Sequence, residues 1–264
     1  MGYSGSTGRR APSGPEARPL SPRRVLRQTL LYGEPLARSV RMFSTEARPF
    51  ASLDPGSLLK GTTTIGLSCK DGVVLATERR ATLGGGFIAN KQTTKLFKID
   101  EHIGMTIAGY VGDAQTLVRY VRAEVNLYRL RRGSPVSVEG AATLLANILN
   151  GNRLYPYLAW VILGGVDARG NHIFSVDPAG GNIEDKYVSV GSGQALAYGV
   201  LEEAYEEGLS LSEGVDVALR GLTSAMRRDS NSGDGYLVAT ISEKEYHDLT
   251  DDEIRKRLTK LKIA

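Results

Sequence analysis

A Gly-Thr pair, Gly61 and Thr62, is the part of this sequence with the clearest chemical potential, and it opens the stretch GTTTIGL. Within a chain, a threonine hydroxyl is a weak nucleophile because no base is certain to lie beside it. At a chain's N-terminus, the α-amino group of the same residue titrates near neutral pH and can accept the hydroxyl proton. A cut after Gly61 would therefore expose a nucleophile that carries its own base, and a glycine leaves the carbonyl at the cut uncrowded. The competing interpretation is that threonines simply favour the β-strand that starts here.

The composition of the chain changes at the same point. Residues 1–61 hold ten basic and four acidic residues, a net charge of +6, together with seven of the ten prolines. Because the whole chain carries +4, residues 62–264 carry −2, and the overall basicity is no argument for nucleic-acid binding. The leader is rich in Gly, Ser, Pro and Arg, and it buries too little apolar surface to offset its ordering entropy. We therefore expect the leader to be largely disordered.

Three interpretations of the leader stay open. It fits a propeptide that is removed on maturation, which is the interpretation that the Gly-Thr junction favours. Its Arg-rich, acid-poor part also resembles a mitochondrial transit peptide. Finally, the true translation start could be Met42 and not Met1.

Other reactive side chains are sparse. Cys69 is the only cysteine, so the sequence contains neither a disulfide framework nor metal-ligand spacing. The three histidines are scattered along the chain, and we interpret them as structural residues. No stretch approaches the roughly 18 apolar residues that a membrane span needs. We expect a cytoplasmic protein without a metal, a cofactor or a membrane contact.

The elements that position Thr62 follow from the periodicity of residues 62–264. The runs 63–69 and 73–78 are rich in β-branched residues and flank Lys-Asp-Gly, a strong hairpin signal. Further strand-like runs are 95–99, 103–108, 158–166, 172–176, 187–190, 235–241 and a short run near Tyr246. Helical periodicity predicts helices over 112–132, 137–150, 193–207, 212–228 and 250–261. Ser210 and Glu213 predict a capping box for the fourth of these helices.

The order of these elements indicates the fold class. Strands are followed by two helices, then strands, two more helices and a last pair of strands. Because helices come in consecutive pairs and do not alternate with single strands, the chain is not a parallel βαβ array. The pattern predicts an α+β fold in one domain over 62–264, with helix pairs packed on antiparallel sheets.

A series of longer motifs extends this interpretation from Gly61 to near the C-terminus. In chain order they are GTTTIGL at 61–67, GVVLATERRAT at 72–82, KLFKID at 95–100, GMTIAGYVGDAQTLVRYVRAE at 104–124, LGGVD at 163–167, FSVDPAGG at 174–181, VGSG at 190–193, YGVLEEAYEEGLSLSEGVD at 198–216 and RRDSNSGDG at 227–235. Together they resemble a β-type subunit of the proteasome core particle, of the archaeal and catalytically active sort. No single short motif carries the resemblance, and the leader lies outside it.

The resemblance implies an N-terminal nucleophile hydrolase fold, a four-layer αββα sandwich of two antiparallel sheets between helix pairs. It also implies a threonine endopeptidase that removes its own propeptide between Gly61 and Thr62. Thr62 matches the nucleophile. An ammonium at Lys95 lowers the pKa of the nearby hydroxyl and amine, and a carboxylate at Glu78 holds that lysine in place. The other matched positions are the oxyanion-binding Gly109 and the polar residues around the threonine amine, Ser192, Asp229 and Ser232.

Substrate contacts are implied for four further residues. Thr82 matches a residue whose backbone hydrogen-bonds an extended substrate, a form of β-augmentation. Ala81, Ile107 and Val111 match the lining of the pocket for the residue before the cut. Because all three side chains are uncharged, we expect apolar residues to be preferred there.

The resemblance also implies an assembly that degrades unfolded proteins in an enclosed chamber. Its members form seven-membered rings with other β subunits, and these rings pair with rings of α-type subunits. A regulatory ATPase ring reaches the chamber through the α ring. The alternatives are a non-catalytic ring subunit that keeps its leader, a bacterial relative that works with a separate ATPase, and a non-enzymatic binding module.

Overall fold

The computed structural model describes residues 61–83 and 86–263, so the predicted propeptide lies outside the described residues except for Gly61. The described part contains two five-stranded antiparallel sheets and a two-stranded hairpin. The first sheet has the order β10 (Tyr187–Gly191), β1 (Thr63–Cys69), β2 (Gly72–Glu78), β11 (Tyr236–Ile241) and β12 (Tyr246–Asp248). The second has the order β5 (Leu96–Asp100), β6 (Ile103–Gly109), β7 (Ala159–Asp167), β8 (Gly170–Val176) and β9 (Asn182–Asp185). The hairpin consists of β3 (Ala81–Leu83) and β4 (Phe87–Asn90).

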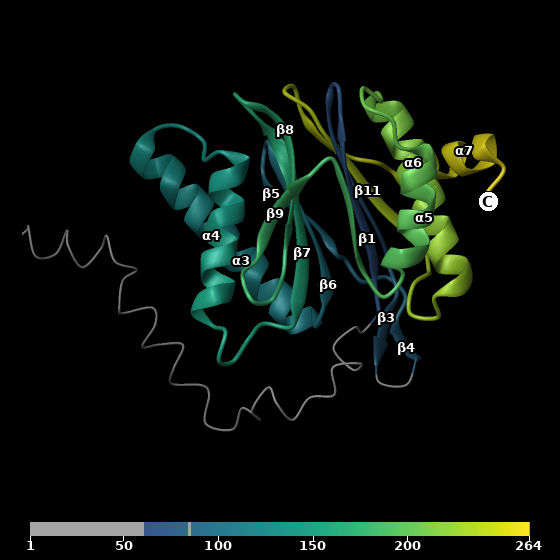
Figure 1. Cartoon of the computed structure of the whole chain (residues 1–264), viewed down its shortest axis with the longest axis horizontal. Helices are drawn as coiled ribbons and strands as arrows, with labels where there is room; N and C mark the ends of the chain where they lie inside the picture. The colour runs from purple at the N-terminus through teal and green to yellow at the C-terminus, as the bar shows by residue number, and fades with distance from the viewer. Residues whose placement is uncertain (1–60, 84–85, 264) are drawn as a thin grey trace, which may run out of the picture. The chain divides into compact units, whose positions relative to one another are not determined.

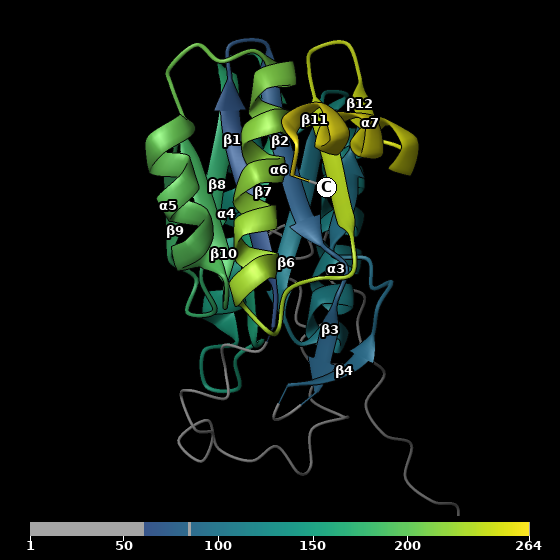
Figure 2. The same cartoon turned by 90° about the vertical axis from the view of Figure 1, so that its right-hand side faces the viewer.

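Two pairs of helices cover the outer faces of the sheets (Figure 1). The helices α3 (Val111–Arg132) and α4 (Val138–Gly151) lie on the second sheet. The helices α5 (Gln194–Ala204) and α6 (Leu211–Arg228) lie side by side on the first sheet, as Figure 2 shows, and α7 (Asp251–Leu261) packs next to α6. No helix of residues 61–83 and 86–263 combines the length and the apolar composition needed to cross a membrane.

Three apolar clusters separate the four layers. One lies between α3, α4 and the second sheet, one between the two sheets, and one between the first sheet and α5, α6. Strand β2 shows the reason, because its side chains alternate between two buried faces. Val73 and Leu75 belong to the cluster between the sheets, whereas Val74 and Ala76 face the helices. The predicted αββα sandwich of the N-terminal nucleophile hydrolase type is confirmed.

Glycines let the two sheets approach each other closely. A Cβ atom on Gly66 of β1 would lie 2.8 Å from Cγ2 of Ile162 on the opposite sheet. A Cβ atom on Gly164 of β7 would lie 2.7 Å from Cδ1 of Ile173 and 3.0 Å from Cγ1 of Val73. Since real Cβ atoms essentially never lie closer than 3.0 Å to another heavy atom, a side chain at either position would force these packed side chains to shift.

The hairpin predicted at Lys-Asp-Gly is present, with a two-residue turn and the pair Cys69–Gly72 closing it. Gly72 begins β2 with a φ of 151°, a backbone conformation that favours glycine. The space around this position is a second reason for glycine. A Cβ atom there would lie 2.2 Å from the carbonyl oxygen of Ile241 on β11. The same glycine therefore serves the hairpin and the close approach of the neighbouring strand.

The predicted capping box is also present at the start of α6. The Ser210 hydroxyl accepts a hydrogen bond from the Glu213 amide, and the Glu213 carboxylate accepts one from the Ser210 amide at 2.8 Å. By contrast, the helix predicted over 193–207 ends early, at Ala204. Tyr205 leaves the helical conformation because its ring packs 4.7 Å from that of Tyr187 and its hydroxyl donates to the Ser68 carbonyl.

We expect Cys69 to be inert in the folded chain. Its side chain is 4% exposed, and burial raises the pKa of its thiol to about 12. Because the thiolate is the reactive form, Ellman's reagent at pH 8 should modify the native chain about 10³-fold more slowly than the urea-unfolded chain. Equal rates for the native and the unfolded chain would contradict this buried position.

Candidate active site

Thr62 immediately precedes β1 and is 2% exposed. Strand β1 holds it in place, because Thr63 pairs with Gly191 of β10 and Thr64 pairs with Thr77 of β2. The hydroxyl of Thr62 donates a hydrogen bond to the carbonyl oxygen of Gly61, and its amide nitrogen donates to Ser192 Oγ at 3.3 Å. The threonine oxygen thus lies against the carbonyl of the peptide bond that precedes it.

The structure favours glycine at position 61. Gly61 has a φ of +45°, a left-handed conformation that other residues adopt at a cost. A Cβ atom on it would lie 2.2 Å from the hydroxyl oxygen of Thr82 and 3.0 Å from Cβ of Asn231. Glycine at position 61 therefore leaves the carbonyl uncrowded, as the sequence argument holds, and also avoids backbone strain and these close contacts.

Lys95 and Glu78 form an ion pair next to Thr62. Glu78 ends β2 and is fully buried, and Lys95, which immediately precedes β5, is 6% exposed. The Lys95 ammonium also donates to the carbonyl oxygen of Arg80 at 2.5 Å. The second carboxylate oxygen of Glu78 accepts hydrogen bonds from the amides of Arg80, at 2.6 Å, and Gly233, at 2.9 Å. The lysine is thus held by one carboxylate and one carbonyl, both of which are fixed by backbone contacts.

Burial acts on both charges of this pair. Removal from water lowers the pKa of Lys95 and raises the pKa of Glu78, because it disfavours the charged form of each group. The attraction between the two charges and their hydrogen bond act in the opposite direction. Breaking the pair from one side would therefore leave a buried charge without a partner.

A second polar cluster lies at the backbone nitrogen of Thr62. Ser192 donates its hydroxyl proton to the Asp229 carboxylate at 2.5 Å, so its oxygen is free to accept the Thr62 amide. Ser232 donates to the same carboxylate oxygen at 2.6 Å and lies 2.7 Å from the hydroxyl of Thr63. Asp229 caps the C-terminus of α6. These contacts orient the Ser192 oxygen toward the atom that would become the α-amino group after a cut.

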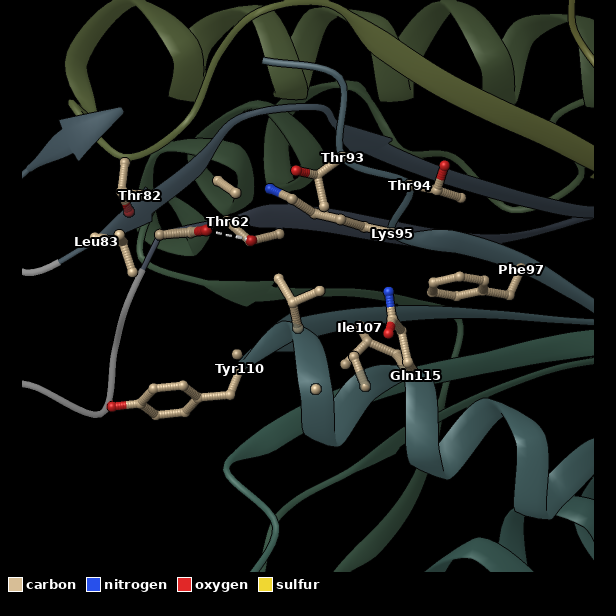
Figure 3. Close-up of a pocket in the computed structure, with 16 residues that line it drawn as sticks. Thr62, Thr82, Leu83, Thr93, Thr94, Lys95, Phe97, Ile107, Tyr110 and Gln115 are labelled. Carbon is tan, nitrogen blue, oxygen red and sulfur yellow. Dashed lines mark hydrogen bonds between the residues drawn. The ribbon is translucent and has the colours of Figure 1, made fainter. Parts of the chain in front are cut away.

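A pocket of about 280 Å³ opens beside Thr62 (Figure 3). It is lined by eight residues that the sequence singled out, namely Gly61, Thr62, Ala81, Thr82, Lys95, Ile107, Gly109 and Val111. In Figure 3, Lys95 extends toward Thr62, while Thr82 lies at one end of the pocket and Phe97 at the other. The pocket thus brings together residues of β3, β6, the start of α3 and the segments before β1 and β5.

Gly109 ends β6 at the wall of this pocket. Its φ is 139°, and a Cβ atom on it would lie 2.1 Å from the carbonyl oxygen of Leu158. Any other residue would therefore displace either β6 or the segment that leads into β7. Gly109 also lines the pocket, so its backbone is accessible from it.

Sequence reasoning missed several lining residues, among them Phe97 at the end of the pocket away from Thr82 and Gln115 on α3 (Figure 3). The sequence spacing could have identified both residues. Phe97 lies two residues after Lys95, and alternate residues of a strand face the same side. Gln115 lies one helical turn after Val111 and so shares its face of α3. Because Gln115, Thr93 and Thr94 also line the pocket, its wall is less apolar than expected.

The arrangement suits nucleophilic attack on a carbonyl. It combines a hydroxyl nucleophile, a neighbouring ammonium, a hydrogen-bonded carboxylate and an uncovered glycine backbone in one place. Within residues 61–83 and 86–263, no group of three or more His, Cys, Asp or Glu side chains is arranged to hold a metal ion.

Comparison with known proteins places these residues in a family context. A family model described as "Proteasome subunit" matches residues 58–241 of the chain. A proteasome subunit beta from Methanothermobacter thermautotrophicus is 56% identical over 204 residues, which cover 77% of this chain and 97% of that protein. One from Ferroglobus placidus is 52% identical over 206 residues, covering 78% and 98%. One from Methanohalophilus mahii is 50% identical over 211 residues, covering 80% and 100%.

Proposed function

Since this chain belongs to the proteasome subunit family, as a β subunit of the proteasome core, we propose that it is a threonine endopeptidase with Thr62 as its nucleophile. The leader, residues 1–61, is a propeptide that the chain removes from itself, and residues 62–264 form the hydrolase domain. One observation supports this function most. The Thr62 hydroxyl contacts the carbonyl of Gly61 in a pocket that also holds Lys95.

The first reaction is removal of the propeptide. The Thr62 oxygen attacks the carbonyl carbon of Gly61, the bond from that carbon to the Thr62 nitrogen breaks, and the hydroxyl proton passes to the nitrogen. The product is an ester that joins Gly61 to the threonine oxygen, and a water molecule hydrolyses it. The propeptide leaves with a carboxylate on Gly61, and Thr62 keeps a free amine. The hydrogen bond that the Thr62 hydroxyl donates to the Gly61 carbonyl oxygen supports this step, because reacting groups that are held together need no diffusional encounter.

The second reaction is hydrolysis of substrate peptide bonds. The free amine of Thr62 accepts the hydroxyl proton, and the oxygen attacks the substrate carbonyl. The Lys95 ammonium favours the deprotonated oxygen, and Glu78 holds the lysine. The amide of Gly109 donates to the developing oxyanion, a contribution that is typically about 3 kcal/mol for a preorganised donor. Ser192, Asp229 and Ser232 orient the amine.

Substrates bind along β3 in the pocket beside Thr62. The backbone of Thr82 pairs with the extended peptide, and the residue before the cut enters the space next to Ala81, Ile107 and Val111. Apolar residues fit this part of the pocket, and Gln115 offers a polar contact further along it. The substrates are unfolded proteins, because an extended segment is needed for strand pairing.

The β subunit assembles with other subunits into the proteasome core. We propose seven-membered rings of β subunits that are flanked by rings of α-type subunits, with a regulatory ATPase ring acting through the α ring in the cytoplasm. Enclosing the sites in a chamber limits an unselective protease to substrates that are threaded inside. The reaction needs no cofactor, since Thr62 supplies its own base.

The test is the intact mass of the chain after co-expression with an α-type partner. Wild type should lose residues 1–61, whereas Thr62→Ala should keep them, because alanine has no hydroxyl to attack the Gly61 carbonyl. Loss of the leader from both chains would assign the cut to another protease. A leader retained by wild type within assembled rings would favour the alternative, a non-catalytic ring subunit.

A further inference from the structure

One guanidinium fastens the loop between α6 and β11 to the end of β2. Arg80 donates from Nε to the Asp234 carboxylate at 2.7 Å and from Nη1 to the carbonyl oxygen of Ser230 at 2.9 Å. The side chains of Arg80 and Asp234 are 20% and 16% exposed. The guanidinium also covers Gly233, where a Cβ atom would lie 2.5 Å from Nη2 of Arg80. The loop and the strand end are therefore held in one relative position by a mostly buried ion pair.

Both halves of the candidate active site depend on this connection. The loop, residues 229–235, carries Asp229 and Ser232, which orient the groups at the Thr62 nitrogen. The strand end carries Glu78 and the carbonyl of Arg80, and both of these hold Lys95. The two segments also meet through the backbone, because the Gly233 amide donates to the Glu78 carboxylate at 2.9 Å.

Asp234 has an unusual backbone conformation. Its φ is 65°, and within residues 61–83 and 86–263 the only other non-glycine residue with a positive φ is Lys262, at the end of α7. Such a conformation costs free energy for a residue with a side chain, and it persists where the surroundings hold it. Here the surroundings include the Arg80 guanidinium, which binds the Asp234 carboxylate directly.

We propose that Arg80 and Asp234 are a positioning pair for the threonine-protease site. Their ion pair sets the distance between the Asp229 and Ser232 cluster on one side of Thr62 and the Lys95 ammonium on the other. Neither side chain lines the pocket, so the pair acts through the residues it holds. This role rests on the proposed function. Because a displacement of about 1 Å in a catalytic group can lower a rate about 10²-fold, the pair should affect turnover more than substrate binding.

The experiment uses the chain assembled with its α-type partner and counts processed Thr62 N-termini by intact mass. The kcat per processed N-terminus and the KM are then measured with a fluorogenic peptide that has an apolar residue before the cut. Arg80→Ala and Asp234→Gly should each lower kcat by about 10- to 100-fold while KM changes by less than about 3-fold. Glycine accepts the positive φ of position 234, so the second variant removes the carboxylate without adding backbone strain.

Two further variants separate this role from a general structural one. Asp234→Asn keeps an oxygen acceptor and tolerates a positive φ, so it should retain kcat within about 5-fold of wild type. Arg79→Ala is the matched control, because Arg79 lies next to Arg80 but its guanidinium pairs with Asp251 of α7 and donates to the carbonyl oxygen of Tyr236 on β11, and it hydrogen-bonds neither Asp234 nor Ser230. It should leave kcat and KM unchanged. The double variant Arg80→Ala/Asp234→Gly should lose no more than the worse single variant, because the two residues act as one unit.

Each remaining outcome would contradict the pairing of the two residues, their positioning role or the proposed function. If the fold losses in kcat of the two single variants multiply in the double variant, the two residues do not act as a pair. An equal loss of kcat in Arg79→Ala would show the same. A lower number of processed N-termini with a normal kcat for each would assign Arg80 and Asp234 to assembly only. An active wild type with unaffected variants overturns the positioning role alone. An inactive wild type overturns the proposed function, and the positioning role with it.

Discussion

Replacing Lys95 by methionine should arrest propeptide removal and lower kcat by about 10³-fold, the size of effect seen when one preorganised electrostatic contact to a reacting group is lost. Methionine fills much of the lysine volume, but it places no positive charge beside Thr62. The hydroxyl then keeps its ordinary, high pKa, and the proton is harder to remove. Intact mass measures the retained leader. For kcat, the substitution is introduced into a chain that begins at Thr62 behind a removable tag.

The same substitution has a second consequence, which needs its own control. It leaves Glu78 fully buried without a counter-charge, and removing one partner of a buried pair typically costs about 3–5 kcal/mol of stability. Lys95→Met/Glu78→Gln removes both charges and should recover most of the thermal midpoint without recovering activity. Lys95→Arg keeps a positive charge at this position and should retain part of the activity. Activity within about 10-fold of wild type in Lys95→Met would contradict the role of the ammonium.

Replacing Gly61 by valine should leave most of the chain unprocessed, and Gly61→Ala should slow processing by about 10-fold. The φ of +45° is unfavourable for alanine and worse for a β-branched residue. The added Cβ atom also meets the Thr82 hydroxyl at 2.2 Å, so the residue must move and carry its carbonyl away from the Thr62 oxygen. The measurement is the time course of leader loss by intact mass after assembly with the α-type partner.

A double variant distinguishes the two causes of this effect. Gly61→Ala/Thr82→Ala removes the contact with the Thr82 hydroxyl but keeps the positive φ, so it should recover only part of the rate. Once the leader is gone, Gly61 is no longer in the chain. The fraction of Gly61→Val that is processed is identical to wild type from Thr62 onward, so it should hydrolyse peptides like wild type for each free Thr62 N-terminus. Normal processing of Gly61→Val would show that the carbonyl position seen in this structure is not the reacting one.

The parts of the fold that could be read from the sequence are those whose side chains repeat with a clear period. Strand β2 begins with a run of apolar residues because both of its faces are buried, and α6 begins at a capping box that the residues 210–213 indicate. The strands β3, β4 and β9 were missed because they are only three or four residues long and none of their residues is fully buried. The early end of α5 was missed because it depends on Tyr187, which lies outside the helix.

By itself, the sequence predicted an α+β domain after a Gly-Thr junction, and its motifs resembled a family with an αββα fold and pointed to the residues around Thr62. Only the tertiary structure decided how these residues meet, because Thr62 contacts Ser192 across 130 positions of the chain. It also revealed the contacts of Phe97, Gln115, Arg80 and Asp234, which lie within the motifs but received no role from them. The physical reason is that periodicity reports which face of an element is buried, whereas a site depends on which elements adjoin. Adjacency is set by strand register and by close contacts such as that between Gly61 and Thr82.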